Sequence, residues 1–363
     1  MTRDTGSSAI SGRAFPESFR RAGQEPSLPP SPSRCADAAR ARGEPIAASA
    51  ARYRRYLLLE AAGPWGASAL DERHLTAPVA RSLARAAADA NANVLLIRRP
   101  GRQRPAPAVA GTPETTGGAG GVARAWAVAD TAPEAERVLW GTWETPGDLL
   151  GLDLTAALPA RAASSGPQRV ALICTNGKRD RCCAIHGRPV AETLAATPGW
   201  DSWESTHLGG HRFAATIMLL PTGDMFGRLD QRTAVAAVER FDAGQFLLSH
   251  YRGRSGQPLP AQAALHAAAV RLGDSRRHAF RLVTVKQGPD ATPDDAERWE
   301  VLVSHHAERG AEVTYRVTVA RGTASPALLS CSDESPKAEA RYAAVSVTRA
   351  GRLRAGSRQP APT

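Results

Sequence analysis

The apolar run Val170-Ala171-Leu172-Ile173 and the segments that follow it constrain the fold more than any other feature of the sequence. A short run of this kind, at the centre of QRVALICT (168–175), predicts a buried strand. The elements predicted after it are, in order, a short helix at 187–197 with Pro189 near its N-terminus, a strand at 201–206, a hairpin at 213–229 around the turn Pro221-Thr222-Gly223-Asp224, and a helix at 231–244 that Gly244 ends. This order predicts an α/β domain over residues 165–250.

Two further segments flank this domain and also contain regular elements. Over 36–160, we predict an N-terminal α/β domain from a strand at 55–61, an Ala- and Leu-rich helix at 78–92, and strands at 93–101 and 123–130. Over 259–349, a helix leads into three segments of alternating pattern: AFRLVTVKQ, RWEVLVSHH and EVTYRVTVA. These three predict a small antiparallel sheet. The predicted fold class is therefore α/β, with a β-rich module in the C-terminal part of the chain.

Segments without apolar periodicity separate or flank these units. Residues 1–34 and 350–363 are rich in Pro, Ser, Gly and Arg, and we predict that both are disordered tails. Residues 101–121 are rich in Gly and Pro, which indicates a flexible loop or insertion. A chain of 363 residues has room for two or three domains, in line with this division.

Charge and cysteine content narrow the class of protein. The 46 basic and 35 acidic side chains give a net charge of +11. The sequence nevertheless has no aromatic-interleaved basic stripe and no helix-turn-helix or zinc-finger spacing, so nucleic-acid binding is not expected. No apolar run approaches the roughly 18 residues of a membrane span, and the N-terminus lacks the apolar core of a signal peptide. Five cysteines, an odd number in a long chain, argue against a disulfide scaffold and predict a cytoplasmic protein.

Two stretches concentrate residue types that bind metals, CTNGKRDRCC at 174–183 and HLGGH at 207–211. Cys174 ends the predicted strand, Cys183 precedes the predicted helix, and the two histidines follow the next strand. We therefore expect all four in loops at the ends of one sheet. The H-x3-H spacing of zinc proteases requires a helix with a Glu after the first His. Here Leu-Gly-Gly intervenes, and because each Gly costs about 1 kcal/mol in a helix, we expect a loop whose backbone N–H groups can approach a bound group.

The donor set leaves four kinds of site open. Two thiolates and two imidazoles suit zinc, or a [2Fe–2S] cluster with histidine on one iron. A redox disulfide is the third alternative, although there is no C-x-x-C motif and the adjacent Cys182-Cys183 pair would be strained. The fourth is that Cys174 and Cys183 are core thiols and the histidines are satisfied locally. Cys35 and Cys331 lie far from the motif in the sequence and are interpreted as isolated structural cysteines.

The same stretches resemble the sucrase/ferredoxin-like family. The block 174–229 is the most specific, and LLLEAAGPWG (57–66) and HYRGRSGQPLPAQAA (250–264) are also similar. The resemblance extends over roughly 36–348. It implies a thioredoxin-like ferredoxin domain over 165–250, with which the predicted order of elements is compatible.

The resemblance also implies a set of ligands. In four-cysteine thioredoxin-like ferredoxins, a widely spaced Cys pair and a C-x3-C pair hold a [2Fe–2S] cluster, and this family is similar with H-x3-H in place of the second pair. The implied ligands are Cys174, Cys183, His207 and His211. Cys183 is preferred to Cys182 because the family's second ligand is the one next to the helix. Cys182 is then a neighbour of the site and not a ligand.

Two positions depart from the family's pattern. Many relatives have His at the position of Asn176 and Cys at the position of Ser205. Neither position belongs to the implied ligand set. The departures therefore leave the ligands intact and change only their surroundings.

The function implied by the resemblance is electron transfer with an unknown redox partner protein. Replacing two thiolates by neutral imidazoles removes negative charge from the cluster, which raises its reduction potential. The residues expected to surround the ligands or dock an acidic partner are Lys178, Arg179, Arg181, Gly209, Gly210 and Arg212. His250, Tyr251 and Arg252 are further candidates for a partner surface, with a helix-end cap as the alternative role.

Two alternative functions stay open from the sequence. The first is a structural zinc protein that uses the same four ligands, and the second is a redox enzyme in which a cluster serves a fused domain. No Ser-His-Asp triad or carboxylate pair for glycoside hydrolysis can be placed. We therefore expect an electron-transfer protein rather than a catalyst.

Overall fold

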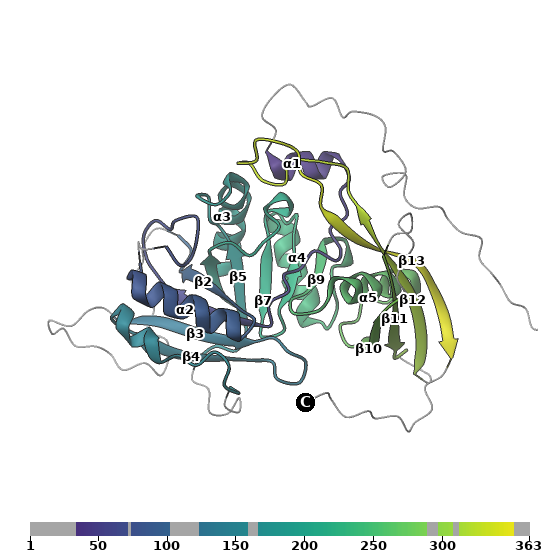
Figure 1. Cartoon of the computed structure of the whole chain (residues 1–363), viewed down its shortest axis with the longest axis horizontal. Coiled ribbons are helices and arrows are strands. Elements are labelled where there is room, and N and C mark those ends of the chain that lie inside the picture. The colour runs from purple at the N-terminus through teal and green to yellow at the C-terminus, as the bar shows by residue number, and fades with distance from the viewer. Residues whose placement is uncertain are drawn as a thin grey trace, which may run out of the picture.

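The structure is a computed structural model, and it describes residues 34–71, 74–101, 123–158, 166–288, 297–307 and 312–351. The tails predicted at 1–34 and 350–363 and the loop predicted at 101–121 lie almost entirely outside the described residues. Figure 1 shows a large sheet with helices packed on it and a smaller sheet in the C-terminal part of the chain. The α/β class with a C-terminal antiparallel sheet is confirmed. None of the helices in the described part of the chain is long and apolar enough to cross a membrane.

The large sheet has nine strands in the order β4-β3-β1-β2-β6-β5-β7-β8-β9. The strands are β1 (Arg55–Glu60), β2 (Ala92–Arg98), β3 (Arg124–Asp130), β4 (Arg137–Trp143), β5 (Val170–Cys174), β6 (Asp201–Ser205), β7 (Ile217–Leu220), β8 (Asp224–Phe226) and β9 (Tyr251–Arg254). The segments 36–160 and 165–250 thus contribute to one continuous sheet, because β2 pairs antiparallel with β6.

The two halves of this sheet have the same topology. In the first half, β1 and β2 are parallel and joined through α2 (Ala77–Asp89), while β3 and β4 continue the sheet antiparallel on the other side of β1. In the second half, β5 and β6 are parallel and joined through α3 (Arg181–Ala195), while β7 and β8 continue it on the other side of β5. α4 (Gln231–Asp242) follows β8. The order of elements predicted for 165–250 is therefore confirmed.

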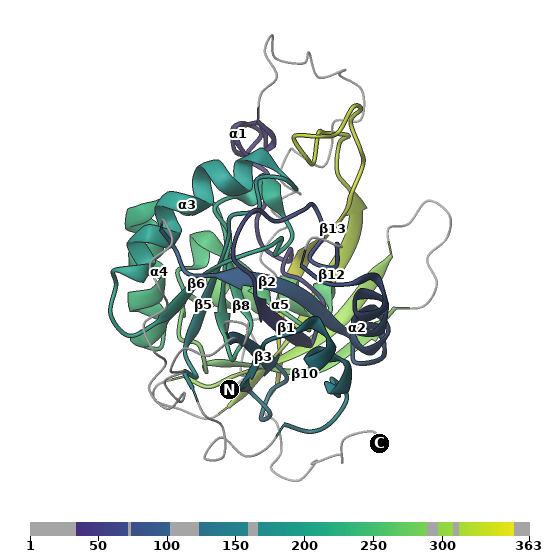
Figure 2. The ribbon, with the colours of Figure 1, turned by 90° about the vertical axis from the view of Figure 1, so that its left-hand side faces the viewer.

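The large sheet is buried on both faces. On one face, Leu58 of β1 and Leu172 of β5 belong to a single core that both halves share. On the opposite face, Leu57 packs in a cluster with α2, and Ile173 packs in a cluster with α3 and α4. Figure 2 shows α2 over one half of the sheet and α3 with α4 over the other. Strands covered on both faces are apolar throughout, which is why the run at 170–173 was an informative signal.

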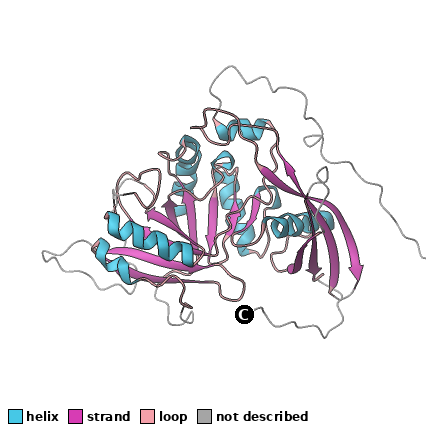
Figure 3. Cartoon of the chain, in the orientation of Figure 1, coloured by secondary structure: helices cyan, strands magenta, loops and turns pink. Residues whose placement is uncertain are grey.

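The C-terminal module consists of α5 (Leu259–Leu272) and a four-stranded antiparallel sheet (Figure 3). Its strands are β10 (Phe280–Gln287), β11 (Arg298–His305), β12 (Val313–Thr323) and β13 (Ala340–Gly351). Buried Ala264 and Ala268 of α5 pack on Val303 and Val317 of the sheet. α5 and the first three strands were predicted, whereas β13 was not. No residue of β13 is fully buried, so burial imposes no apolar alternation on its sequence.

The start of α3 corrects a prediction. The helix begins at Arg181 rather than at 187, so Cys182 and Cys183 lie in its first turn and Pro189 lies inside it. Asp180 is the N-cap, and its side chain accepts a hydrogen bond of 2.9 Å from the backbone N–H of Cys182. Capping by Asp satisfies a free N–H group of the first turn. The Gly and Pro at 187 and 189 had suggested a later start.

Candidate metal centre

The stretches 174–183 and 207–211 come together at one edge of the large sheet. Cys174 is the last residue of β5, and His207 follows β6, which is parallel to β5 and ends beside it. Cys183 lies in the first turn of α3, and His211 begins the 3-10 helix η4 (His211–Phe213). The four residues implied as ligands, hereafter the first group, thus lie in one place.

The donor atoms of the first group are close enough to share a bound species. Sγ of Cys174 is 3.9 Å from Nδ1 of His207, and Nε2 of His207 is 3.3 Å from Nδ1 of His211. Donor atoms of Cys174, Cys183 and His207 all lie within 4.8 Å of one another, a spacing that can hold a metal ion. Both cysteines are 1% exposed, whereas both histidines are partly exposed. The group therefore has a buried thiol side and a histidine side that reaches the surface.

Local electrostatics favour a thiolate at Cys174 and a neutral imidazole at His211. A hydrogen bond from Cys183 holds the pKa of Cys174 well below its usual value, and His207 and the backbone N–H of Leu208 lower it further. The pKa of Cys183 is raised by the same contact and by burial, because a second buried negative charge would be repelled. The pKa of His211 is lowered, chiefly by burial. Deprotonated sulfur and neutral imidazole are the forms that bind metals.

The loop that carries the histidines depends on its two glycines and on a buried arginine. Gly209 and Gly210 have φ of +86° and +69°, a region that side chains other than glycine's rarely adopt. Arg252 is 1% exposed and donates to the carbonyl of Gly209 at 2.9 Å and to the side chain of Ser49 at 3.1 Å. A Cβ on Gly210 would lie 2.4 Å from that guanidinium. The expectation that Arg252 lines a partner surface is wrong, since it fixes the loop from inside.

Close packing at Gly187 sets the distance between the two thiols. A Cβ on Gly187 would lie 2.1 Å from the carbonyl oxygen of Cys174, so only glycine lets α3 approach the end of β5 this closely. Ser205 is the neighbour of Cys174 in the sheet register; it is fully buried, and its Oγ has no hydrogen-bond partner among the described residues. Buried hydroxyls are normally paired. An unpaired one next to Cys174 fits a bound group that can accept its hydrogen bond.

Comparison with known proteins shows which family the chain belongs to. The sequence profile of the sucrase/ferredoxin-like family matches residues 46–253, more than half of the 363-residue chain. The chain belongs to the sucrase/ferredoxin-like family. The matched region begins before β1, ends within β9, and includes every residue of the first group. No curated protein and no solved structure matches the chain.

The basic residues near the ligands fall into two sets. Three are exposed in the β5–α3 loop and at the start of α3: Lys178, Arg179 and Arg181. Arg212 is different, because it is only 8% exposed and forms ion pairs with Glu44 and Glu339. Asp180, which lies inside the same basic run, caps α3. Within the family region, the exposed basic surface at this edge therefore comes from the β5–α3 loop, and Arg212 supports the histidine loop.

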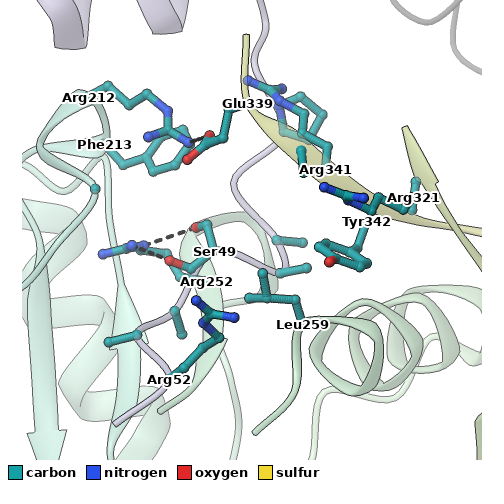
Figure 4. A pocket seen from close by; sticks show the side chains of 18 residues that line it. Ser49, Arg52, Arg212, Phe213, Arg252, Leu259, Arg321, Glu339, Arg341 and Tyr342 are labelled. Atoms are coloured by element: carbon teal, nitrogen blue, oxygen red, sulfur yellow. Dashed lines mark hydrogen bonds and ion pairs between the residues drawn. The ribbon is translucent and has the colours of Figure 1, made fainter. Parts of the chain in front are cut away.

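A cavity of about 460 Å³ lies beside the histidine loop, between the family region and the C-terminal module. Its arginines are Arg52, Arg212, Arg252, Arg321 and Arg341. Figure 4 shows Arg252 reaching Ser49 and Arg212 beside Glu339, with Tyr342 on the facing wall. Arg341 pairs with Glu44, and Arg321 pairs with Glu297. Two of these pairs, Arg212–Glu339 and Arg341–Glu44, thus link the C-terminal module to the rest of the chain.

The three remaining cysteines form a second group with Asp180. The sulfur atoms of Cys35, Cys182 and Cys331 are 3.6, 3.4 and 3.6 Å apart. Both carboxylate oxygens of Asp180 are 3.6 Å from Sγ of Cys35, and this group too could hold a metal ion. The interpretation of Cys35 and Cys331 as isolated is wrong. They are 147 and 149 residues from Cys182, so no local pattern indicated the contact.

Proposed function

We propose that the chain binds a [2Fe–2S] cluster through Cys174, Cys183, His207 and His211 and works as an electron-transfer protein. The observation that carries the proposal is the convergence of two buried cysteines and two partly exposed histidines in a member of the sucrase/ferredoxin-like family. Two thiolates and two imidazoles are the donors of a cluster with histidine on one iron. Such a cluster, when bound, supplies one-electron oxidation and reduction.

The position of His211 favours two metal ions over one. A single tetrahedral zinc ion needs four donors around one point. Cys174, Cys183 and His207 form such a compact set, but His211 is not part of it and contacts the site through His207. In a cluster of two irons, each iron has its own protein ligands, so the four donors do not have to surround a single point. The unpaired Ser205 hydroxyl is a further polar group available to a bound cluster.

The protein's own residues determine how a partner reaches the site. β5 and α3 bury Cys174 and Cys183, which excludes water from the thiol side. The histidine side is partly exposed, so a partner approaches there. The exposed basic residues of the β5–α3 loop lie at the same edge of the sheet. Their charge attracts an acidic surface and raises the rate of encounter.

Iron and sulfide analysis after anaerobic purification, with EPR of the reduced protein, tests the proposal. We expect about two irons and two sulfides per chain, a brown colour and an EPR signal that appears on reduction. Cys174→Ser and His207→Ala should each abolish all three. Cys331→Ser is the matched control, because it removes a thiol outside the first group and should retain them.

Two results would contradict the proposal. Near-zero iron with about one zinc per chain, lost in Cys174→Ser, would show a structural zinc site built from the same residues. That second candidate is favoured by the compact set of Cys174, Cys183 and His207. A cluster that binds but cannot be reduced and reoxidised reversibly would exclude electron transfer while leaving the ligand assignment in place.

A further inference from the structure

The second group has the geometry of a tetrahedral metal site. Its three sulfur–sulfur distances are 3.6, 3.4 and 3.6 Å, between Cys35, Cys182 and Cys331. A zinc ion about 2.3 Å from each sulfur at tetrahedral angles places them about 3.8 Å apart. A disulfide would bring two sulfurs to about 2.05 Å, and no pair is that close. The near-equal spacing fits one shared ion better than a bond between two of the three.

Asp180 provides a fourth donor beside the three sulfur atoms. Its two carboxylate oxygens are each 3.6 Å from Sγ of Cys35, close to the roughly 3.5 Å expected between a thiolate and a carboxylate on one zinc ion. The residue is 3% exposed and also accepts hydrogen bonds from the N–H groups of Cys182 and Cys331 and from the hydroxyl of Ser330. A carboxylate has about four acceptor positions. These bonds therefore orient it and still leave a lone pair for a metal.

Hydrogen-bond donors lie beside two of the three sulfur atoms, those of Cys182 and Cys331. Cys35 and Cys182 are 1% and 0% exposed. The backbone N–H of Ala36 donates to the sulfur of Cys182, and the backbone N–H of Cys35 donates to the sulfur of Cys331. Cys182 also lies in the first turn of the fifteen-residue helix α3, where the helix dipole favours negative charge. Hydrogen bonds aimed at sulfur stabilise the charged form that a metal binds.

We infer that Cys35, Asp180, Cys182 and Cys331 form a structural zinc site, separate from the first group. Three soft thiolates and one carboxylate in tetrahedral arrangement select zinc, and four protein ligands close the site to substrate. The site joins α1 (Cys35–Ala41), the start of α3 and the loop between β12 and β13, which lie together in Figures 1 and 2. Cys35 and Cys331 lie outside the family match at 46–253. Zinc therefore ties segments from both sides of the family region onto it.

Metal analysis of the full chain tests this inference. The protein is expressed with iron and zinc supplied and purified anaerobically under reducing conditions. We expect about one zinc per chain that drops by an order of magnitude in Cys35→Ser and in Cys331→Ser. Cys174→Ser and His207→Ala should leave this zinc in place. Cys331→His exchanges one zinc ligand for another and should retain the metal, which separates the loss of a ligand from a failure to fold.

Any of four outcomes would overturn the inference. The first is zinc that persists in Cys35→Ser and Cys331→Ser. The second is wild-type protein that contains iron but no zinc. The third is a disulfide within the group, seen as a mass lower by two hydrogens in the denatured protein. Zinc lost in Cys174→Ser but kept in Cys331→Ser would place the ion in the first group, and would contradict both this inference and the proposed cluster.

Discussion

Cys182 and Cys183 are neighbours in the sequence, yet they belong to different groups. Successive residues of a helix point about 100° apart, so the first turn of α3 can serve two sites at once. Cys183 joins the first group, whose members all lie between 174 and 211 and inside the family region. Cys182 joins the second group, which also takes Cys35 and Cys331 from outside that region. The first group is thus built from one short stretch, and the second from segments that only folding brings together.

The two halves of the large sheet have the same topology but differ in their metal-binding residues. They share strand order and crossover, yet residues 55–143 contain no cysteine, while the first group lies at the end of β5, in the first turn of α3 and after β6. Function lies in the loops at strand ends and not in the topology. Nothing in the shared fold by itself predicts a metal.

The largest expected effect separates the two neighbouring cysteines. Cys183→Ser should abolish iron and sulfide, because it removes a buried thiolate from the first group, and should leave zinc in the second. Cys182→Ser should do the reverse and retain the iron. Iron, sulfide and zinc measured on the same preparations check both. If each variant lost both iron and zinc, the two groups would be one cooperative site. Asp180 would be the link between them, because its Oδ2 is 3.9 Å from Nε2 of His211.

The second group should matter more for stability than for redox behaviour. With free zinc at a thousandfold over its dissociation constant, binding stabilises the fold by about 4 kcal/mol. Loss of zinc in Cys331→Ser should therefore lower the melting temperature by about 10 °C, as seen by circular dichroism. The EPR spectrum of the reduced protein should not change. Cys331→His is the control, and equal melting temperatures for all three proteins would count against a stabilising role.

A smaller effect should appear when the packing of α3 is disturbed. Gly187→Ala forces α3 away from the carbonyl of Cys174, at a cost of about 1–3 kcal/mol. We expect faster loss of visible absorption from the first group and unchanged zinc, because α1 and the β12–β13 loop can move with α3. Gly147→Ala is the matched control, since its nearest contact would be 3.6 Å away. If the two variants kept their visible absorption equally well, the close approach of α3 to Cys174 would not matter for retention of the bound group.

The smallest effect concerns the exposed basic residues. Replacing Lys178, Arg179 and Arg181 by Ala should slow reduction by dithionite, an anion, by a few fold at low salt. The wild-type rate should fall with added salt, and the rate of the variant should respond less, because the charges are screened over about 10 Å at 0.1 M. Stopped-flow absorbance measures both. Arg232→Ala, exposed on α4, serves as the control. A variant as fast and as salt-dependent as wild type would argue against attraction at this surface.

Much of the fold was predictable because its signals are local. The apolar runs of β1 and β5, the turn at Pro221-Thr222-Gly223-Asp224, and the patterns of α4 and α5 each depend on neighbours in the sequence. β13 was missed because little of it is buried. The start of α3 was missed because its N-cap Asp180 lay inside a charged run that resembled a loop.

The sequence by itself predicted that the members of the first group lie together, because two neighbouring parallel strands carry the segments that hold them to one edge of one sheet. Tertiary structure alone decided the roles of Arg252, Cys35 and Cys331. Arg252 is surrounded by backbone carbonyls and hydroxyls that no sequence pattern indicates. Cys35 and Cys331 meet across 296 residues. Contacts over such separations depend on how whole units pack, and local propensities contain no information about that packing.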